Sequence, residues 1–112
     1  TLVIEARDDG YGGSDYTSSR IVTRNKFTFQ YGRVDIRALL PKGQGMWPAL
    51  WMLGSNFSSV GWPKCGEVDI MEMIGGNGRE NTCYGTIHWD EAGEQWYEVL
   101  SLIVEGILPA VH

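Results

Sequence analysis

The sequence predicts an all-β protein, because short apolar or alternating runs are separated by turns. Among its 112 residues, 15 glycines and 4 prolines supply turn positions. Residues 31–40 show the clearest alternation, with apolar Val34 and Ile36 set against charged Arg33 and Asp35. Side chains alternate across a strand with a period of two residues, so this run predicts a strand with one covered face and one polar face.

Other strand candidates are shorter and lie between polar, glycine-rich segments. Pro48 lies inside the strand expected over residues 46–53, where it requires a sheet edge or a bulge because proline cannot donate a ladder hydrogen bond. Loops are expected over residues 7–14, 41–45 and 54–64. The strands expected nearer the start of the chain are residues 2–6, 17–23 and 26–29.

Three carboxylates interrupt an apolar, strand-like run at residues 66–75. Glu67 and Asp69 share one face of a regular strand, whereas Glu72 would point into the apolar face, where an unpaired charge is costly. One extra residue at Ile70-Met71, a β-bulge, returns Glu72 to the face of the other two acids. We therefore predict a bulge at that position. The alternative is an edge strand with solvated acids.

Clustered acids of this kind are typical of a site for proton transfer or nucleophilic chemistry. With the bulge, the Cα atoms of Glu67 and Glu72 are expected about 13 Å apart, at about 3.3 Å per residue. Side chains that lean inward on a curved strand bring the carboxyl groups to roughly 5 to 6 Å, which is near the spacing of a retaining glycosidase. In such an enzyme one carboxylate attacks the anomeric carbon and the other exchanges a proton, while Asp69 would orient the nucleophile.

The acidic strand is expected to pair antiparallel with residues 81–89 through a turn at residues 75–78. The bulge then places His88 on the carboxylate face, where it can bond to a carboxylate or a sugar. A structural histidine is the alternative. Cys65 and Cys83 would face opposite sides of the sheet, so we expect two free thiols instead of a disulfide.

The run from Glu67 to Glu72 fits the E-x-D-x-x-E signature of glycoside hydrolase family 16, in the bulged branch that contains the laminarinases. The resemblance covers residues 1–89 and leaves residues 90–112 as a divergent tail. It implies a concanavalin A-like jelly-roll β-sandwich that is incomplete here, because family members are considerably longer and this chain begins without methionine. The segments that support the resemblance are Tyr16 to Arg20, Phe27 to Arg33, Leu40 to Gly54, Gly61 to Pro63 and Gly85 to Trp89.

The resemblance implies a retaining endo-β-1,3-glucanase that acts on laminarin-like polysaccharides. Glu67 resembles the nucleophile, Glu72 the general acid/base and Asp69 the assisting residue. A glucan-recognition protein of the same fold is the main alternative, although such relatives typically lack the catalytic glutamates. Enzymes that cut agar, carrageenan or mixed-linkage glucan, and an inactive fragment, are the others.

Aromatic rings and polar side chains are implied to contact the glucan, because flat rings stack well on sugars. Each has an ordinary alternative, namely core packing, a turn or a surface ion pair. The candidate substrate-binding residues are Trp47, Trp51, Trp62, His88, Trp89, Asn56, Arg20 and Arg33.

The charge balance argues against a nucleic-acid partner, since the chain has nine Lys plus Arg, a net charge of -5 and a pI near 4.8. No apolar run reaches the roughly 18 to 20 residues that span a bilayer, and no secretory leader opens the chain. From the family we expect an extracellular monomer with no cofactor. Family members often carry a structural calcium, yet Asp8, Asp9 and Asp15 match no calcium-loop spacing.

The tail after Trp89 leaves helix and strand both open. Apolar residues between Glu98 and Val111 roughly follow helical spacing, with an interruption at Gly106 and a stop at Pro109.

Overall fold

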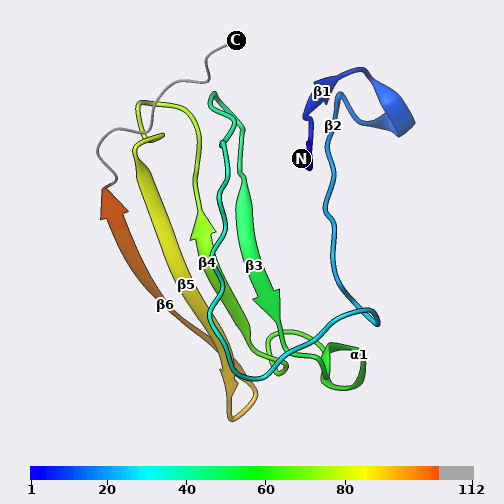
Figure 1. Ribbon diagram of the computed structural model, residues 1–112, viewed down its shortest axis with the longest axis vertical. Helices are drawn as coiled ribbons and strands as arrows, with labels where there is room; N and C mark the ends of the chain where they lie inside the picture. Colours follow the sequence, from blue (N-terminus) through cyan, green and yellow to red (C-terminus); the bar gives the residue numbers. More distant parts are fainter. Residues whose placement is uncertain (104–112) are drawn as a thin grey trace. The chain divides into compact units, whose positions relative to one another are not determined.

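The computed structural model describes residues 1–103 of the chain. It contains two compact units, one over residues 1–32 and one beginning at Arg33 (Figure 1). The first unit holds a two-stranded sheet and the second a four-stranded sheet. Within the described residues, no helix has the length and apolar character needed to cross a membrane.

The first unit is organised by one short hairpin. Strand β1 (Arg7–Asp8) pairs antiparallel with β2 (Tyr16–Thr17), and the connection contains a 3-10 turn at Tyr11–Gly13. The Thr17 hydroxyl donates to the Asp9 carboxylate at 2.9 and 3.0 Å, which fixes the two arms of the hairpin.

The strand predictions for this unit are largely wrong. No ladder forms over residues 2–6 or 26–29 in the described part of the chain, and β2 covers one residue of the strand expected at 17–23. Residues 7 and 8, expected in a loop, form β1 instead. Apolar alternation shows which face of a strand would be covered, but a ladder also requires a partner at the right register.

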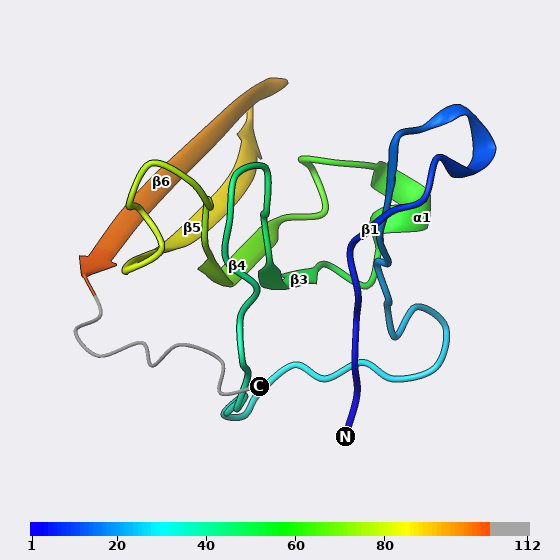
Figure 2. The same ribbon diagram turned by 90° about the horizontal axis from the view of Figure 1, so that it is seen from above.

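The second unit is a four-stranded antiparallel sheet in the order β3-β4-β5-β6, seen in Figures 1 and 2. One short helix, α1 (Phe57–Val60), lies in the connection between the first two strands. The all-β prediction is therefore confirmed. The strands are β3 (Ala49–Leu53), β4 (Glu67–Glu72), β5 (Thr82–Glu91) and β6 (Glu94–Ile103).

The predicted bulge is present in β4. Between Asp69 and Glu72, β4 advances three residues while β5 advances two, from Thr86 to Tyr84. On the other side, Leu50 and Trp51 are consecutive in β3 but pair with Met71 and Asp69 of β4. Both ladders thus place one extra residue at Ile70-Met71, and the predicted pairing with residues 81–89 is also confirmed.

The opposite face of this sheet carries the apolar residues of β4 and its neighbours. Residues 31–40, predicted as a strand, form no ladder with any described residue. Val34, Asp35 and Ile36 line an open groove of about 350 Å³ together with Leu50 and Ile70. The prediction of a strand with one covered face is wrong for this segment, since Val34 and Ile36 are 39% and 48% exposed.

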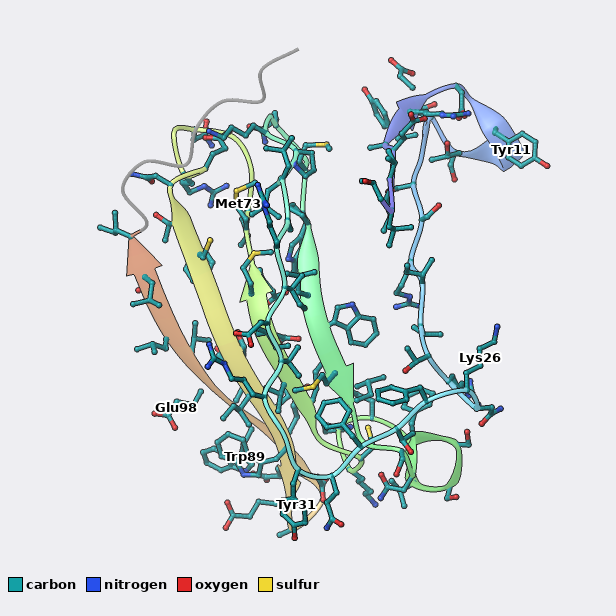
Figure 3. All side chains as sticks on the ribbon, in the orientation of Figure 1. Tyr11, Lys26, Tyr31, Met73, Trp89 and Glu98 are labelled. Carbon is teal, nitrogen blue, oxygen red and sulfur yellow. The ribbon has the colours of Figure 1, made fainter. Side chains whose placement is uncertain are left out.

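Side-chain burial is concentrated at few positions. Met73, the residue after β4 and labelled in Figure 3, is fully buried, and its N–H donates to the Pro48 carbonyl at 3.1 Å.

Cys65 and Cys83 are both free, which confirms the prediction of two free thiols.

Strand β6 settles the structure of the tail up to Ile103. A two-residue turn at Ala92 and Gly93 joins it to β5, and both residues have positive φ, at 56° and 89°. Such turns favour Asn-Gly or Asp-Gly, so Ala92 conceals the hairpin from sequence reasoning. The helical spacing is misleading for residues 98–103, which form a strand, and residues 104–112 lie outside the described residues.

Candidate active site

The three acids of β4 lie on one face of the sheet because of the bulge. In the β4–β5 ladder, Glu67 pairs with His88, Asp69 with Thr86 and Glu72 with Tyr84. Directly paired residues of antiparallel strands project on the same side, so this face also receives the side chains of β5 that the sequence predicted there.

Asp69 is the buried centre of the cluster, with an exposed fraction of 4%. Loss of solvent around the carboxyl raises the pKa of Asp69 from 3.8 to about 6, and the negative charges of Glu67 and Glu72 add to that effect. A hydrogen bond with Glu67 also raises the pKa of Asp69, whereas His88 lowers it. A proton held between Asp69 and Glu67 therefore persists to higher pH than on an isolated aspartate.

His88 bonds to Asp69 through Nε2, at 3.1 Å from Oδ2. Its other ring nitrogen, Nδ1, is buried and has no hydrogen-bond partner in the described part of the chain. A buried N–H without an acceptor is costly, so the tautomer that carries its proton on Nε2 avoids an unpaired N–H at Nδ1. The predicted bond between His88 and an acid of the cluster is confirmed.

The two glutamates each receive an indole N–H. Trp62 Nε1 donates to Glu67 Oε2 at 2.6 Å, and Trp47 Nε1 donates to Glu72 Oε1 at 3.0 Å. The Thr86 hydroxyl, on the same face, donates to Glu72 Oε2 at 3.3 Å. Each acid of the cluster thus has at least one hydrogen-bonding partner of its own.

An aromatic row crosses the strands beside Glu67. The His88 ring is close to both Trp62 and Tyr97, with ring centroids 5.8 and 6.0 Å away. Tyr97 belongs to β6 and pairs with His88, which puts it on the carboxylate face. Sequence reasoning missed Tyr97 because it left β6 undecided, and recognition of the Ala92-Gly93 turn would have placed Tyr97 opposite His88.

Among the predicted substrate-binding tryptophans, Trp47 and Trp62 touch the acids and Trp51 pairs with Asp69 on their face. Trp89 does not join them. It follows His88 in a regular strand and pairs with Trp96, so alternation places it on the face opposite the acids, and its role in substrate binding stays a prediction.

Two of the three polar candidates, Arg33 and Asn56, make local contacts of their own. Arg33 forms an exposed ion pair with Asp35 at 2.9 Å, which is the surface alternative. Asn56 precedes α1, and its backbone carbonyl accepts from Ser59 and Val60 as in a turn. Arg20 belongs to the first unit, and its role stays a prediction.

Within residues 1–103, one group of side chains on this face could hold a metal ion. Glu67, Asp69 and His88 each offer a ligand atom, and the three atoms lie within 4.8 Å of one another. The same side chains already make hydrogen bonds. Glu67 accepts from Trp62, and His88 bonds to Asp69.

Comparisons with known proteins agree with this geometry. The sequence model of the XgeA-like, catalytic GH16 domain matches residues 3–97. The chain belongs to glycoside hydrolase family 16. The match runs past residue 89, where the recognisable motifs end, and includes the start of β6.

Individual relatives support the laminarinase-like resemblance. A beta-glucanase of Rhodothermus marinus is 51% identical over 89 residues, which is 78% of this chain and 30% of that protein. The catalytic domain of an endo-1,3-beta-glucanase (laminarinase) from Thermotoga petrophila has a TM-score of 0.74 at 51% identity, over 95% of this chain and 43% of that domain. A beta-1,3-glucan-binding protein of Penaeus monodon is 44% identical over 65% of this chain and 21% of its own length.

The predicted family and the jelly-roll fold class are both confirmed by these matches. The chain spans less than half the length of each of these relatives.

Proposed function

We propose that this chain is the acid-bearing part of a retaining endo-β-1,3-glucanase that hydrolyses laminarin-like polysaccharides. The observation that carries the proposal is the β4 bulge, which brings Glu67, Asp69 and Glu72 to one face and gives both glutamates a hydrogen-bond donor. Two carboxyl groups on one face are what double displacement at a sugar carbon requires. The family and the glucanases among the relatives support the same reaction.

In the first step Glu67, as a carboxylate, attacks the anomeric carbon and forms a glycosyl ester. Glu72 donates its proton to the departing glycosidic oxygen, so the bond between that oxygen and the anomeric carbon breaks without release of an alkoxide. Asp69, bonded to both Glu67 and His88, keeps the nucleophile oriented.

In the second step water enters from the side that the leaving sugar vacated. Glu72, now a carboxylate, removes a proton from the water as it attacks the anomeric carbon, and Glu67 leaves as a carboxylate. Two inversions restore the original β configuration. Glu72 is protonated again and the site returns to its first state.

Binding without hydrolysis is the second candidate, since one relative is named a glucan-binding protein. The presence of both Glu67 and Glu72 favours an enzyme, because a binding protein has no need of two carboxyls held by dedicated donors. Substrate class is a separate alternative, since other relatives are named endo-1,3-1,4-beta-glycanase and keratan-sulfate endo-1,4-beta-galactosidase.

The working form is proposed to be an extracellular monomer without cofactor or nucleic-acid partner. The family and the net charge of -5 support this proposal. Gel filtration measures the oligomeric state, and activity that is unchanged by a chelator would support the absence of a metal.

The test is a comparison of glucans on the purified chain. Laminarin, lichenan and agarose are incubated with the natural chain and with Glu67→Gln, and new reducing ends are measured. We expect release from laminarin by the natural chain and a loss on the order of 10⁴-fold in the variant. Circular dichroism shows that both samples are folded. Binding of laminarin by a folded chain that releases no reducing ends would favour the binding protein instead.

A further inference from the structure

The two indole N–H groups that end on the glutamates come from different loops. Trp47 precedes β3 and Trp62 lies between α1 and β4. The exposed fractions of the two side chains are 67% and 44%, so neither is a core residue. A ring that serves only to stack on a sugar presents its face and does not need its N–H on a carboxyl oxygen.

Both tryptophans are held at the backbone on either side. The carbonyls of Met46 and Pro48 accept from Gly75 and Met73 at 2.8 and 3.1 Å, and Trp47 lies between them. The carbonyls on either side of Trp62 are held in the same way. Gly61 accepts from the Cys65 N–H and Pro63 from the Gly66 N–H, each at 2.9 Å. Each indole therefore starts from a fixed backbone position, which is what a directional contact requires.

An indole N–H is a donor only, so the oxygen it binds must offer a lone pair. In a protonated carboxyl group that oxygen is the carbonyl oxygen. The bond from Trp47 to Oε1 of Glu72 therefore leaves Oε2 to carry the proton, and Oε2 faces the Thr86 hydroxyl. A hydroxyl can donate to Oε2 in the carboxylate and accept from it in the acid.

At Glu67 the same kind of donor has a different effect. The bond from Trp62 is 2.6 Å long, and short hydrogen bonds to an ionised group are about twice as strong as neutral ones. Glu67 also shares a hydrogen bond with Asp69, so one proton has two carboxyl groups to choose between. The Trp62 donor and the bond with Asp69 together fix the orientation of the Glu67 carboxyl group.

We propose that Trp47 and Trp62 are positioning residues, which act through their indole N–H groups to fix the orientation of the Glu72 and Glu67 carboxyl groups and to stabilise a negative charge on them. This inference rests on the proposed glucanase function for its kinetic consequence. It differs from a sugar-stacking role because it depends on one N–H and not on the ring face.

The decisive variants replace each tryptophan with β-(3-benzothienyl)alanine, which keeps a bicyclic ring but has sulfur in place of the N–H. When the Trp62 N–H is removed, Glu67 should take up a proton more readily. The Trp62 variant should therefore move the acidic limb of the pH profile of kcat/KM for laminarin about one unit to higher pH. When the Trp47 N–H is removed, Glu72 should keep its proton to higher pH. The Trp47 variant should therefore move the basic limb of the same profile to higher pH.

Trp96 offers the matched control, because it lies on β6 on the opposite face of the sheet. The same replacement there should leave both limbs unchanged. Unmoved limbs in the Trp47 and Trp62 variants of an active protein would overturn the inference, as would limbs that exchange between the two variants.

A second measurement does not need activity. In a chain labelled with ¹⁵N-tryptophan, Glu67→Gln should move the indole N–H resonance of Trp62 upfield, and Glu72→Gln should do the same for Trp47, with Trp96 unmoved. Indole resonances that ignore these substitutions would overturn the inference. The expected shifts in a folded chain that cleaves no glucan would instead support the two bonds and count against the proposed glucanase.

Discussion

The two faces of the four-stranded sheet differ in how completely their side chains are partnered. On the carboxylate face Asp69 and Thr86 are 4% and 5% exposed and are hydrogen-bonded within the cluster. On the apolar face Ile87, the next residue after Thr86, is 52% exposed and Leu100 is 67% exposed. The polar site is assembled by one hairpin and two short loops, whereas these apolar residues stay more than half exposed.

The largest expected effect is on catalysis by Glu72, on the carboxylate face. Glu72→Gln removes the proton donor, so hydrolysis of laminarin should fall by about 10² to 10⁴-fold. An aryl β-glucoside with a good leaving group needs little protonation and should lose far less activity. The two substrates are compared in initial-rate assays, and an equal loss on both would show that Glu72 is not the general acid.

The next effect contrasts a covered apolar side chain with an uncovered one. Met73→Ala should lower the free energy of unfolding by about 2 to 5 kcal/mol, because the residue is fully buried and truncation removes its packing contacts. Ile87→Ala, on the half-exposed part of the sheet, should cost about 1 kcal/mol or less. Urea unfolding measures both, and equal costs would mean that Ile87 is covered in solution.

A smaller effect concerns the pH dependence of stability. Since the pKa of Asp69 rises from 3.8 to about 6, the folded chain binds this proton more tightly than the unfolded chain does. The stabilising contribution is complete below about pH 4 and is lost as the pH rises through about 6. Asp69→Asn cannot ionise, so it should remove a pH dependence on the order of 2 to 3 kcal/mol.

Urea unfolding at pH 4 and pH 7, on the natural chain and on Asp69→Asn, measures how the free energy of unfolding of each changes with pH. A variant that keeps the natural slope would show that another group is responsible.

The site was more predictable than the fold around it. Strand parity and the cost of burying a charge were enough to place the bulge at Ile70-Met71, and the bulge fixed the register of His88. The same parity argument could not show that residues 31–40 lack a ladder, because pairing depends on a partner that alternation does not identify. Trp89 was proposed by residue type alone, and its parity places it on the face opposite His88.

The indole contacts could not be predicted from the sequence. Trp47 and Trp62 stand out as aromatic residues beside Gly or Pro, which is equally consistent with stacking and with core packing. Only loop geometry brings each N–H to a carboxyl oxygen. Directional contacts made from loops require the three-dimensional path of the chain, whereas contacts within a ladder follow from its register.

The central claim is that Glu67 and Glu72 on one bulged strand carry out double displacement. Proton NMR of the first laminarin products, recorded before mutarotation, measures the configuration of the new reducing end directly. The account predicts that the β-anomer appears first and that the α-anomer grows in later. Initial release of the α-anomer would contradict it, because a single displacement by water inverts the anomeric centre.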